Sequence, residues 1–414
     1  MMKGTPLRPD AVIFSSLLIA ILATGLVATF ITQPLRDEVI HHEPMARNLT
    51  IESIFSPGSA YSSAYPPLPY VFGNLAWRLN PSLRSLRLLN LAVFLAVILI
   101  FRLIALKISA SPGFLTLLFA MNPYLLKASF TYLMYNWGVL FALAGLYLYF
   151  FQPGRFLPLA HLLLGMAVLS QQWLLAVVAA ILLHEFVKLR RREIGCRAFS
   201  WRVLLKALFL LPAAFLFWSW RGLVHPNFAS HSLHPTFEHL NAVLATLGLA
   251  LAFLVAAHWR RIARSRPIAL VFLLPLLWLA IPAHSQGHGL SVITGITSQL
   301  AVKGAVLLGA PYKVTMFAFI LIGLASLFLL ISPKKQDLQQ VMNYSLLGLI
   351  AAFAASSRLA ASHIFACLPF AWLALSDEIE NMGWAKHAMI AQFIVITIVY
   401  SVYIVFFRSR GVMF

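Results

Sequence analysis

The chain has 414 residues, of which 61% are hydrophobic and 10% charged, and its mean hydropathy is +0.86. A soluble globular protein carries about 25% charged residues, so this composition excludes a soluble enzyme and indicates a membrane protein. The net charge of +19 does not predict nucleic-acid binding, because the basic residues form short clusters between apolar segments, as cytoplasmic loops beside anionic lipids do. No polar stretch is long enough to enclose a core, so we predict one integral membrane domain over residues 1–414.

The apolar segments predict an all-α polytopic fold with about thirteen transmembrane helices. The first runs from Ala11 to Ile31, and we interpret it as a retained helix because no small-residue cleavage site follows it. Basic residues before it place the N-terminus in the cytoplasm. The region 156–187 has the weakest signal, since Gln171 and Gln172 interrupt it, and a broken pair of helices fits it as well. The remaining spans are predicted at 86–107, 112–130, 132–151, 156–170, 171–187, 203–220, 239–257, 267–283, 311–331, 338–355, 359–376 and 387–407.

This topology leaves polar stretches on the outer side at residues 32–85, 221–238 and 284–310. The chain has only 12 acidic residues, and the acids predicted to lie outside are concentrated in the first of these loops. Apart from Glu238, they are Asp37, Glu38, Glu43 and Glu52. We therefore predict that residues 32–85 form the catalytic loop and carry helices that lie in the membrane interface.

The segment Arg36–Glu43 combines scarce acids with a pair of histidines directly after the first span. On an α-helix, Asp37 and His41 are four residues apart, as are Glu38 and His42, so each pair shares a face. A carboxylate held where water is partly excluded can act as a general base, and a neighbouring histidine can tune it or hold a phosphate. The alternative is a polar helix start satisfied by water. We name Asp37 and Glu38 as catalytic candidates and both histidines as substrate-binding candidates.

No resident metal or other cofactor is predicted. Glu38-x-x-His41 has the spacing of half a carboxylate-bridged di-metal site, but such sites need a second motif and further glutamates on facing helices. The zinc-protease order His-Glu-x-x-His is also absent from the sequence. Weak binding of a divalent cation by Asp37 or Glu38 stays open.

Two further features in or next to the first outer loop are candidates for ligand contacts. The consecutive prolines Pro66 and Pro67 fix an extended turn within Tyr65–Tyr70, so that Tyr65 can frame a sugar-sized groove. The alternative is a rigid loop with no ligand. Arg84 and Arg87, three residues apart where the chain enters the second span, are placed to meet an anionic phosphate, although arginines at helix ends also extend to the interface without a ligand.

The order of these features resembles the GT-C glycosyltransferases, which are polytopic enzymes that use polyprenyl-phosphate-linked sugars. The resemblance covers about residues 30–95 and is strongest to the dolichyl-phosphate-glucose alpha-1,2-glucosyltransferases, with the protein O-mannosyltransferases as further relatives. It includes Asp-Glu-x-x-His from Asp37, the Pro-Pro turn at Pro66, and Leu-Arg-x-x-Asn ending at Asn90. Asn136 stands where the family has an acid. Arg358 resembles the late outer arginine that contacts the lipid phosphate.

The resemblance implies an inverting transfer in which Asp37 takes the proton of the acceptor hydroxyl. Arg358, with Arg87 or Lys313, would meet the phosphate, and Asn136 would contact the substrate. The implied partners are a polyprenyl-phosphate sugar donor, a glycan, lipid or protein acceptor, and membrane lipids, with no nucleic acid. The alternatives are a flippase for lipid-linked saccharides, a polysaccharide ligase, and a scaffold without activity. Short loops favour the plasma membrane of a prokaryote over the endoplasmic reticulum membrane.

Overall fold

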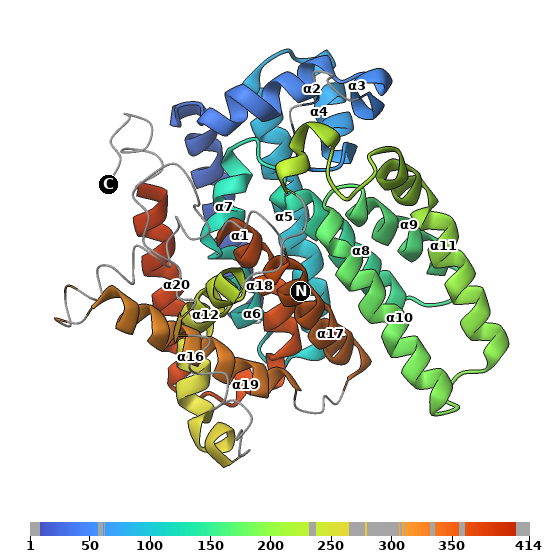
Figure 1. Cartoon of the computed structure of the whole chain (residues 1–414). Coiled ribbons are helices and arrows are strands. Elements are labelled where there is room, and N and C mark those ends of the chain that lie inside the picture. Colours follow the sequence, from blue (N-terminus) through green and yellow to red (C-terminus); the bar gives the residue numbers. More distant parts are fainter. Residues whose placement is uncertain are drawn as a thin grey trace, which may run out of the picture.

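The computed structural model describes residues 9–56, 61, 63–231, 237–264, 278–279, 306, 309, 311–331, 336–355 and 361–402. Within these ranges every regular element is a helix, which confirms the predicted all-α class (Figure 1). The span predicted at 267–283 and the outer loop at 284–310 lie almost wholly outside the described residues, and Arg358 lies outside them as well.

Several helices have the length and composition of membrane spans. Among the described residues, 6 helices qualify: α1 (Pro9–Ile31), α5 (Leu83–Ile108), α10 (Leu175–Arg190) taken with the short helix η2 (Gln172–Leu174) before it, α11 (Cys196–Ser219), α12 (Phe237–Arg264) and α16 (Tyr312–Ile331). A bent pair, α7 (Pro123–Phe130) and α8 (Tyr135–Phe151), makes up to 7 if it counts as one span. Other predicted spans coincide with shorter or more polar helices: α6 (Pro112–Ala120), α9 (Leu157–Val168), α17 (Asp337–Ala354), α18 (Ala361–Ala374) and α20 (Ala385–Val402). The count of thirteen stays a prediction.

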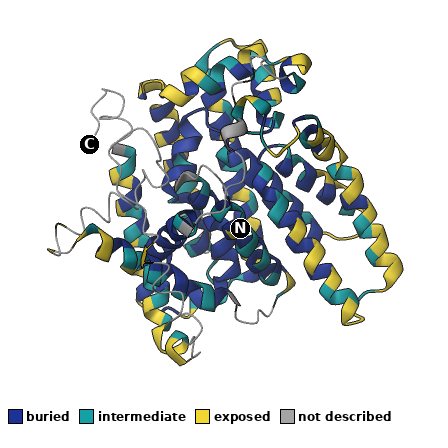
Figure 2. Cartoon of the chain, in the orientation of Figure 1, coloured by how far each residue is buried: buried dark blue, intermediate teal, exposed yellow. Residues whose placement is uncertain are grey.

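An apolar face of α11 is exposed from Leu204 to Trp218. Leu204, Leu208, Leu211, Phe215 and Trp218 are each more than half exposed, and their spacing of three and four residues places them on one side of the helix. Figure 2 shows exposed residues along the outer sides of α10 and α11. Water disfavours an apolar stripe of this size, so the stripe supports a membrane-embedded protein.

The structure divides the span predicted at 112–130 into α6 and α7. The division lies at Asn122, whose side chain accepts hydrogen bonds from the backbone N–H groups of Tyr124 and Leu125. Pro123 occupies the first helical position, where its missing N–H costs nothing. An N-cap followed by proline starts a new helix, and the apolar composition on both sides hides this signal in the sequence.

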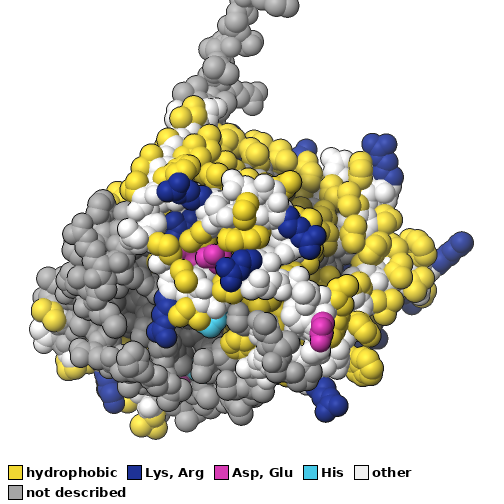
Figure 3. Space-filling model, turned by 90° about the horizontal axis from the view of Figure 1, so that it is seen from above, with side chains coloured by type: hydrophobic (Ala, Val, Ile, Leu, Met, Phe, Trp, Pro, Cys, Tyr) yellow, Lys and Arg dark blue, Asp and Glu magenta, His cyan; other side chains and the backbone are white. Residues whose placement is uncertain are grey.

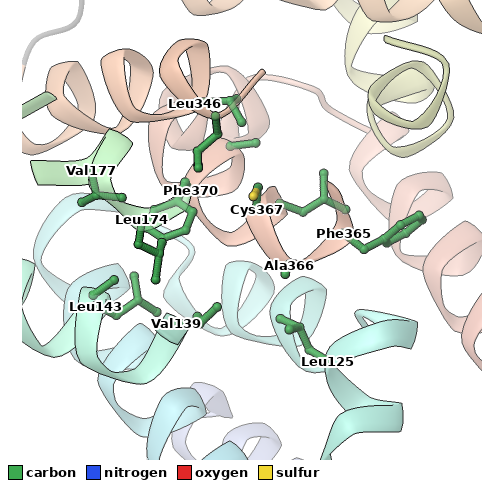
Figure 4. Close-up of a cluster of buried hydrophobic side chains, with 14 of the residues drawn as sticks. Leu125, Val139, Leu143, Leu174, Val177, Leu346, Phe365, Ala366, Cys367 and Phe370 are labelled. Atoms are coloured by element: carbon green, nitrogen blue, oxygen red, sulfur yellow. The ribbon is translucent and has the colours of Figure 1, made fainter. Parts of the chain in front are cut away.

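The helices form two groups on either side of α5, and a small layer covers one end (Figure 1). Helices α8–α11 form one group, while α12 and α16–α20, including α19 (Ser376–Glu380), form the other. The covering layer contains α2 (Glu43–Asn48), α3 (Ile51–Phe55) and α4 (Leu68–Leu79). Buried apolar side chains join the two groups where α7, α8, α10, α17 and α18 meet, among them Leu125, Leu143, Val177, Leu346 and Phe370 (Figure 4).

Helices α12 and α16 are in close backbone contact at two glycines. A Cβ atom built on Gly323 would lie 1.9 Å from the carbonyl oxygen of Leu244, and one built on Gly248 would lie 1.9 Å from that of Phe319. Small residues of this kind let helix backbones approach each other inside a membrane, where van der Waals packing drives helix association. The contact therefore depends on the absence of side chains at both positions.

We expect Gly323→Ala to lower the free energy of unfolding by about 1–3 kcal/mol, because the added methyl group forces the two backbones apart. The measurement is the midpoint of thermal unfolding in detergent. Gly222→Ala is the control, since nothing lies within 4 Å of a Cβ atom at that position. Equal midpoints for the two variants would contradict the close contact.

Candidate functional site

A buried ion pair joins the first loop to the start of α5. The Arg87 guanidinium donates to both oxygens of the Glu38 carboxylate, with Nη2–Oε2 at 2.7 Å and Nε–Oε1 at 2.9 Å. Its Nη1 donates to the carbonyl oxygens of Thr29 and Thr32 at the end of α1. Glu38 also accepts from the backbone N–H of Tyr132, at 2.6 Å. Both side chains are thus saturated by protein partners and hold α1, α5 and the α7–α8 connection together.

Asn90, one turn further along α5, holds the break between α7 and α8. Its amide nitrogen donates to the carbonyl oxygens of Thr131 and Leu133, each at 2.8 Å, and its oxygen accepts from the indole N–H of Trp137. These bonds satisfy backbone groups that a continuous helix would pair internally. The two helices are bent by 111° at this point, so the span predicted at 132–151 begins after a sharp turn.

A second break lies beside the first, between α9 and α10. Here η2 (Gln172–Leu174) follows an extended residue, Gln171, which confirms the broken pair considered for 156–187. Gln171 donates to the carbonyl of Met134, and the Gln172 side chain donates to the carbonyl of Ala64 in the loop before α4. The two helix breaks and the first loop therefore meet at one place.

The segment that carries the scarce acids and histidines is a π-helix, η1 (Glu38–His42), in which the N–H of Glu43 bonds to the carbonyl of Glu38. This π-helix differs from the α-helix that the sequence predicted. A π-turn is wider than an α-turn, so residues four apart no longer lie on the same face of the helix. Glu38 points toward Arg87 and is fully buried, whereas Asp37 is exposed. The negative charge of Asp37 acts on His42, five residues on.

His42 is held by tyrosine and serine hydroxyls. The Tyr70 hydroxyl lies 2.7 Å from His42 Nδ1 and donates to Ser63 Oγ at 2.7 Å. Because that hydroxyl has one hydrogen, we assign the N–H of His42 to Nδ1, which leaves Nε2 as an acceptor. Burial lowers the pKa of His42 to about 4, against the opposing effect of the Asp37 charge. His42 is therefore neutral at neutral pH.

Tyr65 joins this cluster to the C-terminal half of the chain. Its hydroxyl lies 2.9 Å from Nε2 of His363 at the start of α18. The ring of Tyr135, the first residue of α8, packs edge-on against both. Burial raises the pKa of Tyr65 well above its usual value, and Tyr135 and the Asp37 carboxylate raise it further, so the hydroxyl stays protonated. We call Asp37, His42, Tyr65, Tyr70, Tyr135 and His363 the Asp37 cluster.

The Asp37 cluster belongs to the end of the molecule that α2–α4 cover. Seen from this end, acidic, histidine and basic side chains are visible on one face, and one acidic group lies next to a Lys or Arg side chain (Figure 3). A carboxylate, a neutral imidazole and tyrosine hydroxyls together offer both acceptors and donors. The aromatic faces add an apolar surface. Such a set suits a polyhydroxylated ligand such as a sugar.

The other predicted residues in the first loop take supporting positions. Pro66 is buried and Pro67 is the N-cap of α4, so the Pro-Pro turn fixes where this helix begins. His41 is half-buried beside His42. Arg84 is exposed and lies over the ring of Phe30, 5.4 Å from its centre. Among these, Arg84 is the side chain that remains open to a ligand on the surface.

Asn136 lies beneath the surface rather than within the Asp37 cluster. It is fully buried, and its amide donates to the carbonyl of Leu125 at 3.1 Å. It thereby ties the start of α8 back to α7 across the break. In the described residues no group of three or more His, Cys, Asp or Glu side chains is arranged to hold a metal ion.

Sequence reasoning did not include Tyr135 and His363 among the site residues. His363 is 298 positions from Tyr65, and no local pattern links residues so distant. The available signals were indirect: Tyr135 lies in a tyrosine-containing segment after Asn122-Pro123, and His363 follows Arg358 in the chain.

Glu38→Gln should lower the free energy of unfolding by about 3–5 kcal/mol, because it leaves the Arg87 charge buried without its counter-ion. The matched control is Glu52→Gln, which makes the same change at an exposed position in the same loop. Unfolding midpoints of both variants in detergent measure the difference. If Glu38→Gln matched the control, the ion pair would not hold the loop.

The pKa of His42 predicts a pH dependence of stability. Its folded value of about 4 lies below the usual 6.5, so the folded state binds fewer protons than the unfolded state between these values. Stability should fall as the pH drops from about 6.5 to about 4, by at most about 3 kcal/mol. His42→Gln should remove this component, whereas His387→Gln, at an exposed position, should retain it. An unchanged pH profile in His42→Gln would refute the assignment.

The chain was compared with protein families, curated proteins and solved structures. No family model, curated protein or solved structure matches it. The evidence on function is therefore the arrangement of the chain's own side chains.

Proposed function

We propose that this protein is a membrane-embedded glycosyltransferase of the GT-C type. It moves a sugar from a polyprenyl-phosphate donor to an acceptor at the outer membrane face, with inversion at the anomeric carbon. The observation that carries the proposal is the position of Asp37. This carboxylate is exposed after the end of the first span, and its charge acts on the buried His42 and the half-buried Tyr65. The proposal includes the thirteen-span arrangement and a prokaryotic plasma membrane.

The proposed step is a single displacement. The acceptor hydroxyl oxygen forms a bond to the anomeric carbon while the bond between that carbon and the phosphate oxygen breaks. Asp37 takes the proton of the acceptor hydroxyl, which is the role of a general base. The polyprenyl phosphate leaves with the electron pair of the broken bond. Because His42 is neutral at neutral pH, it can bond to the sugar without lowering the basicity of Asp37.

The surrounding residues divide into two roles. Tyr65 and His363 are the proposed contacts of sugar hydroxyls. Arg84 and Arg358 are the proposed contacts of the donor phosphate, since guanidinium groups suit phosphate oxygens. Glu38, first considered as a second catalytic acid, is a positioning residue in this scheme. Its carboxylate is fully used by Arg87 and backbone N–H groups, and Arg87 is likewise occupied.

Asp37→Asn should lower sugar transfer by at least about 100-fold, because the amide cannot accept the proton and general bases contribute about 10²–10⁴-fold. The assay measures transfer of radiolabelled sugar from a panel of polyprenyl-phosphate sugars by the purified full-length protein. The unfolding midpoint should stay unchanged, since Asp37 is exposed.

Glu52→Gln is the matched control, as it changes an exposed acid in the same loop, and it should retain transfer within about twofold because it touches no reacting group. Equal transfer by wild type and Asp37→Asn would move the base elsewhere. Absence of transfer from every donor by a folded wild type would refute the glycosyltransferase.

A further inference from the structure

A second group of polar side chains lies in helices α8–α11, far from the Asp37 cluster. It consists of Tyr149 on α8, His161 on α9, Glu185 on α10, and Arg202 and Lys206 on α11. Helix α8 begins in the Asp37 cluster and carries Tyr149 near its other end, fourteen residues on. A rise of 1.5 Å per residue separates the two clusters by about 21 Å. We call this group the Glu185 cluster.

Direct contacts connect the charged members of the Glu185 cluster. Lys206 Nζ lies 2.5 Å from Glu185 Oε2, and both side chains are almost fully buried. The Tyr149 hydroxyl donates to the other Glu185 oxygen. Arg202 Nη1 lies 3.3 Å from the Tyr149 hydroxyl and 3.7 Å from Glu185. A single carboxylate is thus shared by two cations and a hydroxyl.

The charges of the Glu185 cluster do not balance. Within the described residues, Glu185 is the acid that pairs with Arg202 and Lys206, so the cluster carries one excess positive charge. An uncompensated charge is costly to bury inside a protein or near a membrane. The Arg202 side chain is 31% exposed, so one side of the cluster is open. An anion bound at Arg202 would neutralise this excess positive charge.

His161 supplies independent evidence of a missing ligand. Its side chain is 2% exposed, and neither ring nitrogen has a hydrogen-bond partner in the described part of the chain. Its ring packs edge-on against Tyr149 at 5.7 Å between centres, and the positive charges of Arg202 and Lys206 act on it. Buried polar atoms are rarely left unpaired. A bound anion at Arg202 would provide an acceptor for the His161 N–H.

The depth of the Glu185 cluster indicates which anions can reach it. Glu185 is five residues before the end of α10 and Arg202 is six residues after the start of α11. These positions are about 8–9 Å from the helix ends. Helix α11 has 24 residues and is about 36 Å long, compared with about 30 Å for the hydrocarbon core of a bilayer. A helix centred on that core extends about 3 Å beyond it at each end, so the Arg202 backbone lies about 6 Å inside the hydrocarbon boundary. The long Arg202 side chain can extend from there to the level of the lipid headgroups.

We propose that the Glu185 cluster binds a phosphate group, with Arg202 and His161 as its contacts and the membrane lipids as its source. The planar guanidinium of Arg202 bonds to two phosphate oxygens, and His161 donates to a third oxygen or to one of these two. Glu185 keeps Lys206 and Tyr149 in place beneath the anion. Basic residues around the α10–α11 turn, including Lys188, Arg190, Arg191 and Arg192, raise the local concentration of anionic lipid.

The test uses the purified full-length protein in a neutral detergent. Short-chain phosphatidylglycerol, a zwitterionic phosphatidylcholine and sodium phosphate are each titrated while the midpoint of thermal unfolding is recorded, because a ligand of the folded state raises that midpoint. We expect a saturable rise with phosphatidylglycerol. Arg202→Gln should weaken the apparent affinity at least about tenfold, in line with the loss of a charged bidentate hydrogen bond. A saturable rise with sodium phosphate that depends equally on Arg202 would assign the site to free phosphate.

Arg197→Gln is the matched control, since it removes the same charge at an exposed position in the first turn of the same helix. It should leave the affinity within about twofold, as expected for an exposed basic side chain. If Arg202→Gln does not fold, Arg202→Lys keeps the charge and loses the planar fork, and it should weaken binding several-fold. The proposal would be overturned if Arg197→Gln weakened binding as much as Arg202→Gln does. It would also be overturned if neither phosphatidylglycerol nor sodium phosphate gave a saturable rise of the unfolding midpoint.

Discussion

The ion pair between Glu38 and Arg87 is the interaction on which the arrangement at the covered end depends. Burying two charges is tolerable only where their remaining hydrogen-bonding capacity is filled, and here backbone groups of three separate segments fill it. Thr29 and Thr32 at the end of α1 accept from Arg87, while Leu35 and Tyr132 donate to Glu38. The pair therefore sets the path of the chain where it leaves the first span, and it also supports the break between α7 and α8.

Fixing Glu38 inside the protein directs its neighbour Asp37 outward. The wide turn of η1 then places His42 against Tyr70, and the Pro-Pro loop delivers Tyr65 to His363. The ends or breaks of several helices meet here, so helices carry most side chains of the Asp37 cluster, and Tyr65 lies in the loop that the Pro-Pro turn fixes. A site that must hold a sugar and a reacting hydroxyl in fixed positions benefits from this support, because a small displacement of the reacting groups strongly lowers the reaction rate.

The sequence predicted the helices better than it predicted the contacts that the candidate site residues make. Hydropathy places most helices because the apolar segments are long, and the scarcity of acids singles out the first loop. The pairing of Glu38 with Arg87 joins positions 49 residues apart, and each residue alone has the pattern of a catalytic acid or a phosphate contact. Local spacing contains no information on such a pairing. The π-turn and the contact of Tyr65 with His363 likewise depend on tertiary packing, which the spacing of apolar residues in the sequence does not reveal.

The packing around Asn136 bears on the acid that the glycosyltransferase resemblance would place there. The Asn136 amide donates to the carbonyl of Leu125 inside the α7–α8 break, and its own oxygen has no hydrogen-bond partner among the described residues. A carboxylate at this buried position would set a negative charge against that carbonyl oxygen, without the N–H that now joins the two helices. An amide is therefore what the local structure requires. The base of the proposed reaction has to come from the exposed side of the cluster, where Asp37 lies.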